Sequence, residues 1–143
     1  MDRGMLKTDL VRDLVRDEGM RLKPYTDTVG KVTIGVGRNL DDVGISEDEA
    51  LAMLDADIDR SMADLDRTLP WLFERPEPVR RALVNMCFNL GWPRLSGFRN
   101  MLDALEAGDY DRAAAEALDS RWARQVGARA ERIAALFREG AVA

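Results

Sequence analysis

The sequence of 143 residues contains no histidine and a single cysteine. Without histidine the chain cannot build a Ser-His-Asp or Cys-His catalytic arrangement, or a metal site with histidine ligands. One cysteine excludes an internal disulfide and a cysteine cluster for zinc or iron–sulfur. Cys87 lies in an apolar helical run, so we expect a small buried hydrophobe and not a reactive thiol. We therefore expect no metal and no cofactor, and any chemistry falls to carboxyl and hydroxyl groups.

Long apolar runs are also absent. No segment approaches the roughly 20 apolar residues of a membrane span, and the charged N-terminus lacks the apolar core of a signal peptide. We expect neither membrane insertion nor an export signal. The net charge of −5 is uneven, because residues 41–119 are acidic and both ends are mildly basic. An acidic middle argues against nucleic acid as a partner.

The first helical segment, residues 6–18, ends on an acid in an unusual position. Its apolar stripe has the i, i+3, i+4 spacing of one helical face and consists of Leu6, Leu10, Val11, Leu14 and Val15. Glu18 is the next position on that stripe, just before Gly19, which we expect to end the helix. A carboxyl group there faces the core and the negative end of the helix dipole. Both effects favour the protonated form, which a general acid needs.

Residues 31–37 alternate strictly and predict a strand in a small hairpin or sheet. Val32, Ile34 and Val36 are expected to form its apolar face, and Thr33, Gly35 and Gly37 a nearly bare face. Residues 26–30 predict the turn before it. A bare face lets a ligand approach the backbone closely, which makes Gly35 a candidate substrate-binding position.

The rest of the chain predicts helices. Ser46 and Glu49 form a capping box that opens a long helix, which Pro70 ends after residue 69. Four further helical runs are expected at residues 79–90, 98–107, 110–118 and 128–139, with Gly91, Gly108 and Gly140 as stop signals and Asp109 as a cap. The predicted class is α+β and mainly helical.

Three side chains form the candidate site for chemistry. Glu18 at the helix end, Asp27 in the turn and Thr33 on the strand can reach one cleft across short connections. Two carboxyl groups in unlike environments are typical of an acid and a base. Each also has an ordinary explanation: a glutamate paired with arginine, an aspartate in an Asx turn, and a threonine in a strand.

These residues lie in a segment that resembles a known family. Residues 18–37, EGMRLKPYTDTVGKVTIGVG, are similar to the catalytic segment of the bacteriophage-type lysozymes, glycoside hydrolase family 24. The resemblance continues in residues 82–91, 96–98, 120–122 and 129–132, and so covers nearly the whole chain. It implies hydrolysis of the β-1,4 bond between N-acetylmuramic acid and N-acetylglucosamine in peptidoglycan.

The resemblance also implies residue roles. Glu18 is the acid, and Asp27, helped by Thr33, places the attacking water. The family is regarded as inverting, so the carboxyl groups are expected about 6.5–9.5 Å apart. Arg129 matches an arginine near the acid, and its charge opposes the protonated form of Glu18.

Two further positions are matched less specifically. Phe88 and Asn89 correspond to the family's cleft positions, with a core phenylalanine and a helix-surface asparagine as the alternatives. Together with Gly35 and Arg129 they are the expected substrate-binding residues. The chain departs from the family at Arg38, where relatives often have histidine, and in the short segment from Arg38 to Ile45. An ion pair of that histidine is lost, although arginine can still meet an acid.

The implied organisation is a single lysozyme-like domain over residues 1–143 with two lobes. A small lobe spans about 19–50, a connecting helix about 46–69, and a helical lobe about 76–143 together with the N-terminal helix. We expect a monomer with peptidoglycan as its partner.

The resemblance favours an endolysin that lyses a bacterial host, an antimicrobial, bacteriolytic hydrolase. Without a signal peptide it is expected to be made in the host cytoplasm and to reach the periplasmic wall through a separate membrane pore. The alternatives are a lytic transglycosylase, which needs no Asp–Thr water site, and a non-catalytic wall-binding or tail-structural domain. A helical DNA-binding regulator is disfavoured by the acidic middle.

Overall fold

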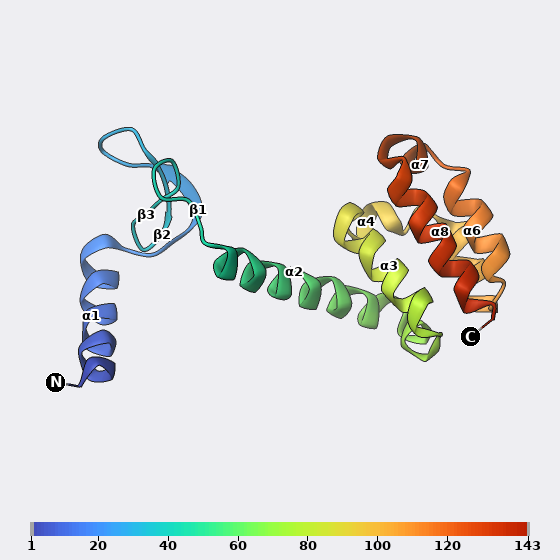
Figure 1. The fold of residues 1–143 in the computed structure, drawn as a ribbon, viewed down its shortest axis with the longest axis horizontal. Coiled ribbons are helices and arrows are strands. Elements are labelled where there is room, and N and C mark those ends of the chain that lie inside the picture. Colours follow the sequence, from blue (N-terminus) through green and yellow to red (C-terminus); the bar gives the residue numbers. More distant parts are fainter. Residues whose placement is uncertain (1, 143) are drawn as a thin grey trace. The chain divides into compact units, whose positions relative to one another are not determined.

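The computed structural model describes residues 2–142, whose contacts divide into two units with the boundary between Leu51 and Ala52. The first unit contains one helix, a small sheet and the start of a long helix (Figure 1). Its elements are α1 (Arg3–Glu18), β1 (Arg21–Thr26), β2 (Val32–Gly35), β3 (Arg38–Asn39) and the beginning of α2 (Glu47–Thr68). The strands form an antiparallel sheet in the order β1-β2-β3.

Helix α1 has the predicted end. The side chain of Asp2 caps its start by accepting from the N–H groups of Gly4 and Met5. At its other end Gly19 has φ +77° and donates its N–H to the carbonyl of Val15. An L residue is strained at that φ, which explains why the helix stops after Glu18.

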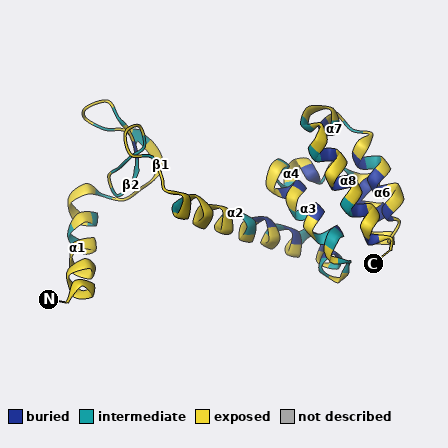
Figure 2. Ribbon diagram, in the orientation of Figure 1, coloured by how far each residue is buried: buried dark blue, intermediate teal, exposed yellow. Residues whose placement is uncertain are grey.

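The apolar stripe of α1 is not buried in the structure. None of the described residues of the helix is buried, and its larger apolar side chains are exposed (Figure 2). The side chain of Glu18 is exposed within the first unit, and its expected core-facing environment stays a prediction. Assignment of this helix to the helical lobe stays a prediction.

The faces of the small sheet differ from the prediction. Thr33 is 2% exposed and Val32 is 38% exposed, so the expected apolar and bare faces were wrong at these positions. Thr33 pairs with Tyr25 of β1 and with Asn39 of β3, so strands cover it on both sides. Strand β1 contains Pro24, which it tolerates because it is an edge strand.

The second unit is helical and holds the hydrophobic core. After α2 it contains η1 (Pro70–Glu74), α3 (Glu77–Leu90), α4 (Trp92–Leu95), α5 (Arg99–Ala107), α6 (Tyr110–Leu118), α7 (Arg121–Val126) and α8 (Ala128–Gly140). Helix α8 packs against α3 and α6. The largest side chain in the fully buried centre is Phe137. Within residues 2–142, no helix has both the length and the hydropathy of a membrane span.

The capping box and most helix positions are confirmed. The Glu49 carboxylate accepts from the Ser46 N–H at 2.9 Å, and the Glu49 N–H donates to the Ser46 hydroxyl at 3.1 Å. Cys87 is buried in the core as expected, and burial raises the pKa of its thiol. Sequence reasoning missed β3 in an expected loop and the short helices α4 and α7, which span few residues.

The last helix ends at Gly140, as predicted, but this glycine does not act as the expected stop signal. It is the last residue of α8 and is buried, and its φ is not positive. A Cβ atom there would clash with Cγ2 of Val79 and would lie 3.1 Å from Cδ2 of Tyr110. The glycine is needed for close packing of α8 on α3 and α6, and not for a turn.

We predict that Gly140→Ala destabilises the second unit by about 1–3 kcal/mol, because the added methyl group overpacks a tight contact. Urea unfolding measures this change. Glu139→Ala, at an exposed neighbouring position, serves as the control and should stay within about 0.5 kcal/mol of the original chain. Equal stability of the two variants would contradict the packing argument.

Candidate active site

Asp27 is held by its own turn, directly after β1. Its Oδ1 atom accepts from the N–H of Val29 at 2.9 Å and from the N–H of Lys31 at 2.8 Å. The N–H of Asp27 donates to the Lys31 carbonyl at 2.8 Å, and the N–H of Gly30 to the Asp27 carbonyl at 3.1 Å. The side chain is therefore fixed in the predicted Asx turn through Oδ1, which leaves Oδ2 for a ligand.

The Lys31 peptide brings Thr33 and Asp27 together. Its carbonyl oxygen accepts from the Thr33 hydroxyl at 3.0 Å and also from the N–H of Asp27. Because the hydroxyl proton of Thr33 is used in this bond, its oxygen can only accept a hydrogen bond from a water. The structure thus joins two of the three predicted catalytic residues through one backbone group.

Glu18 lies against the turn between β2 and β3. A Cβ atom placed on Gly37 would be 3.2 Å from Oε2 of Glu18, so the carboxylate rests where other residues carry a side chain. Gly37 also has φ +69°, a conformation that favours glycine. All three predicted catalytic residues therefore flank the same small sheet, with Asp27 before β2 and the Glu18 carboxylate beside the turn that follows it.

Gly35 ends β2, opposite Arg21 of β1. It has φ +69°, and no atom of the described residues lies within 4 Å of the position of a Cβ. Space therefore remains beside the Gly35 backbone, and its contact with a substrate stays a prediction.

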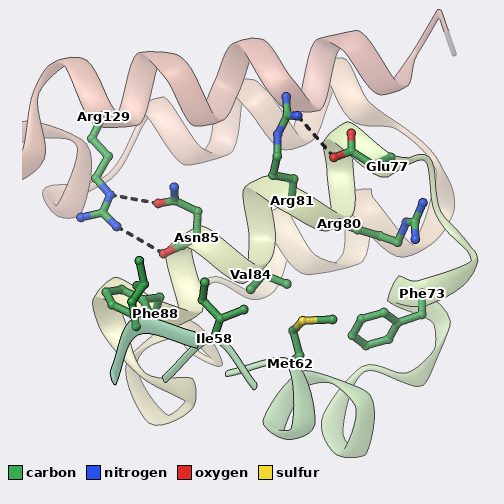
Figure 3. A pocket seen from close by; sticks show the side chains of 11 residues that line it. Ile58, Met62, Phe73, Glu77, Arg80, Arg81, Val84, Asn85, Phe88 and Arg129 are labelled. Carbon is green, nitrogen blue, oxygen red and sulfur yellow. Dashed lines mark hydrogen bonds and ion pairs between the residues drawn. The ribbon is translucent and has the colours of Figure 1, made fainter. Parts of the chain in front are cut away.

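In the second unit, Phe88 and Arg129 line one groove (Figure 3). The groove has a volume of about 500 Å³ and an apolar floor that includes Ile58, Met62 and Val84. Arg129 donates from Nε to Oδ1 of Asn85 at 3.0 Å and from Nη2 to the Asn85 carbonyl at 3.5 Å. The expected pairing of Arg129 with Glu18 stays a prediction, because these residues belong to different units.

Asn89 has a structural partner. Its Oδ1 accepts from the indole Nε1 of Trp122 at 2.8 Å, which ties α3 to α7. Trp122 is 4% exposed and packs edge-on against Phe98. Asn89 is not among the residues that line the groove, so its predicted part in substrate binding has no support from this geometry.

Three charged residues of the groove were not predicted from the sequence. Glu77, Arg80 and Arg81 line it together with Phe88 and Arg129, and Figure 3 shows the side chains of Arg80 and Arg81 extending from α3. The signal was the i, i+4 series Glu77–Arg81–Asn85, which places three polar side chains on one face of α3.

Together these features define a class. A small antiparallel sheet with the carboxyl side chains of Glu18 and Asp27 beside it, followed by a long helix and further helices, belongs to the α+β class and is mainly helical. Comparison with known families agrees. The family described as phage lysozyme matches residues 15–139, and the chain belongs to this family.

Relatives of two kinds are similar to the chain. The pre-baseplate central spike protein Gp5 of Enterobacteria phage T4 is 30% identical over 89% of this chain, which spans only 27% of that protein. Probable T4-type lysozymes 2 and 1 of Dictyostelium discoideum are 27% and 25% identical, each over 91% of this chain and 94% of their own length.

We predict that Gly37→Ala shifts the Glu18 carboxylate, because the new methyl carbon would lie 3.2 Å from Oε2, closer than an ordinary van der Waals contact. The chemical shift of the Glu18 carboxyl carbon, measured by NMR, should change. Gly108→Ala is the control, since Gly108 also has positive φ but has no atom near its Cβ position. Both variants should lose about 1–2 kcal/mol of stability through backbone strain. An unchanged Glu18 shift in Gly37→Ala would contradict the assigned contact.

Proposed function

We propose that the chain is a muramidase that hydrolyses the β-1,4 bond between N-acetylmuramic acid and N-acetylglucosamine in peptidoglycan. The observation that carries the proposal is the Lys31 peptide, which binds both Asp27 and Thr33 on the sheet whose turn meets Glu18. Membership of the phage lysozyme family supports the same substrate.

In the proposed mechanism, protonated Glu18 gives its proton to the glycosidic oxygen as the bond to the anomeric carbon breaks. The carboxylate of Asp27, with Oδ2 free of the turn, takes a proton from a water, and the remaining hydroxide oxygen bonds to the anomeric carbon. The Thr33 oxygen accepts the second hydrogen of that water and so orients it. Direct attack by water inverts the anomeric configuration and needs the two carboxyl groups about 6.5–9.5 Å apart.

The biological role is a further part of the proposal. The role proposed first is an endolysin that reaches the periplasmic wall through a separate membrane pore and acts as a monomer on peptidoglycan. Similarity to the Dictyostelium discoideum proteins named as probable lysozymes, along nearly their whole length, supports the lysozyme part of this role. The second candidate is a lysozyme-like domain that belongs to a virion. It is favoured by the similarity to the T4 spike protein, of which the chain spans only a part.

We predict that Glu18→Gln lowers peptidoglycan cleavage by about 10²–10⁴-fold, the usual contribution of general acid–base catalysis. Clearing of permeabilised Gram-negative cells, followed by turbidity beside the unchanged chain, measures it. Equal clearing by both proteins would refute the role of Glu18. Mass spectrometry of the products distinguishes a hydrolase, which leaves reducing ends, from a lytic transglycosylase, which leaves 1,6-anhydro ends.

We predict that Asp27→Asn and Asp27→Ala separate catalysis from structure. Asparagine keeps an oxygen that accepts from the N–H groups of Val29 and Lys31, so the turn should survive while the base is lost. Both variants should lose about 10²–10⁴-fold in kcat. Only Asp27→Ala should also lose about 1–3 kcal/mol of stability, as measured by urea unfolding. Full activity in Asp27→Asn would show that the carboxylate takes no proton.

A further inference from the structure

Arg38 makes a three-point contact at the start of β3. Its Nη1 donates to the Gly44 carbonyl at 3.2 Å and to Oε1 of Glu49 at 2.8 Å. Its Nη2 donates to Oε2 of Glu49 at 2.6 Å. This is the bidentate geometry in which an arginine–carboxylate pair is most directional.

Glu49 is itself fixed, as the third residue of α2. Its carboxylate accepts from the Ser46 N–H, and its own N–H donates to the Ser46 hydroxyl. The hydrogen bonds from Arg38 and from the Ser46 backbone lower the pKa of Glu49 to about 2. The pair is therefore intact above the ordinary carboxyl pKa of 4.5 and is lost only as the pH falls through about 2.

A single residue, Gly37, lies between the Arg38–Glu49 ion pair and the Glu18 carboxylate. Arg38 follows Gly37 directly, and Gly37 is the residue against which the Glu18 carboxylate rests. Gly37 has φ +69° and no side chain of its own to anchor it. The Arg38 side chain therefore anchors this turn to the start of α2 and to the carbonyl of Gly44.

We propose that Arg38 and Glu49 are positioning residues that hold the Gly37 turn in place and thereby orient the carboxyl group of Glu18. An isolated, exposed ion pair contributes little to the free energy of folding. This one differs, because both carboxylate oxygens are used, a backbone carbonyl takes a third bond, and both side chains are more than half covered (37% and 43% exposed). The effect on catalysis rests on the proposed function, whereas the effect on the turn does not.

Arg38→Gln and Glu49→Gln test this. Glutamine at position 49 keeps the capping box, so α2 should still begin at the same place. In both variants the backbone order parameter of the Gly37 amide should fall from about 0.85 to below about 0.6. The chemical shift of the Glu18 carboxyl carbon should change as well. Peptidoglycan cleavage should lose about 10- to 100-fold in kcat with KM within about twofold, because the acid is misplaced and not removed.

The double variant and a matched control sharpen the test. Arg38→Gln with Glu49→Gln should lose no more activity than either single change, because the two residues act as a unit. Arg67→Gln breaks another arginine–carboxylate pair on α2, to Asp64 at 3.0 Å, whose arginine is 68% exposed. It should leave Gly37, Glu18 and kcat unchanged.

A rigid Gly37 in both single variants, or losses that multiply in the double variant, would overturn the proposal. If the unchanged chain does not cleave peptidoglycan, the proposed function fails, and the order parameter of Gly37 with the Glu18 shift still decides this inference. The two failures are therefore distinguishable.

Discussion

The candidate site depends on the two backbone groups of one residue, Lys31. Its N–H fixes the Asp27 carboxylate, and its carbonyl oxygen accepts from both the Asp27 N–H and the Thr33 hydroxyl. Backbone groups of a sheet end are less mobile than long side chains, so the carboxylate and the hydroxyl are held without a further side chain. The turn at residues 26–30 is thus the local structure that sets the relative positions of the proposed base and the residue that orients its water.

At the opposite end of β2, a side-chain ion pair takes the place of the backbone hydrogen bonds made by Lys31. There the Glu18 carboxylate meets a glycine with no side chain, and the neighbouring turn is held by the Arg38–Glu49 pair and not by a backbone network. A guanidinium does not titrate between pH 5 and 9, whereas a histidine does. The contact at Glu49 therefore keeps its charge over that whole range.

Local signals predicted much of the fold. Gly19, the Ser46–Glu49 box and the Asp109 cap each act through neighbouring backbone groups, so their sequences were sufficient. The features that the sequence did not predict depend on contacts between residues distant in sequence. Gly140 has the appearance of a stop signal but serves helix packing. Thr33 is covered because strands lie on both its sides, which alternation along β2 alone cannot show.

The hydrogen bond of Thr33 to the Lys31 carbonyl limits the hydrogen bonds that its hydroxyl group can make with a water. A threonine on an open face offers its hydroxyl as donor or acceptor, but here the proton is committed to the Lys31 carbonyl. A water bound to this oxygen must donate one hydrogen to it, which directs its other hydrogen and a lone pair elsewhere. If the other hydrogen points to Oδ2 of Asp27, the lone pair is left for the anomeric carbon. The hydrogen bond to Lys31 thus leaves the Thr33 oxygen only as an acceptor, which is compatible with its proposed role of orienting a water beside the proposed base Asp27.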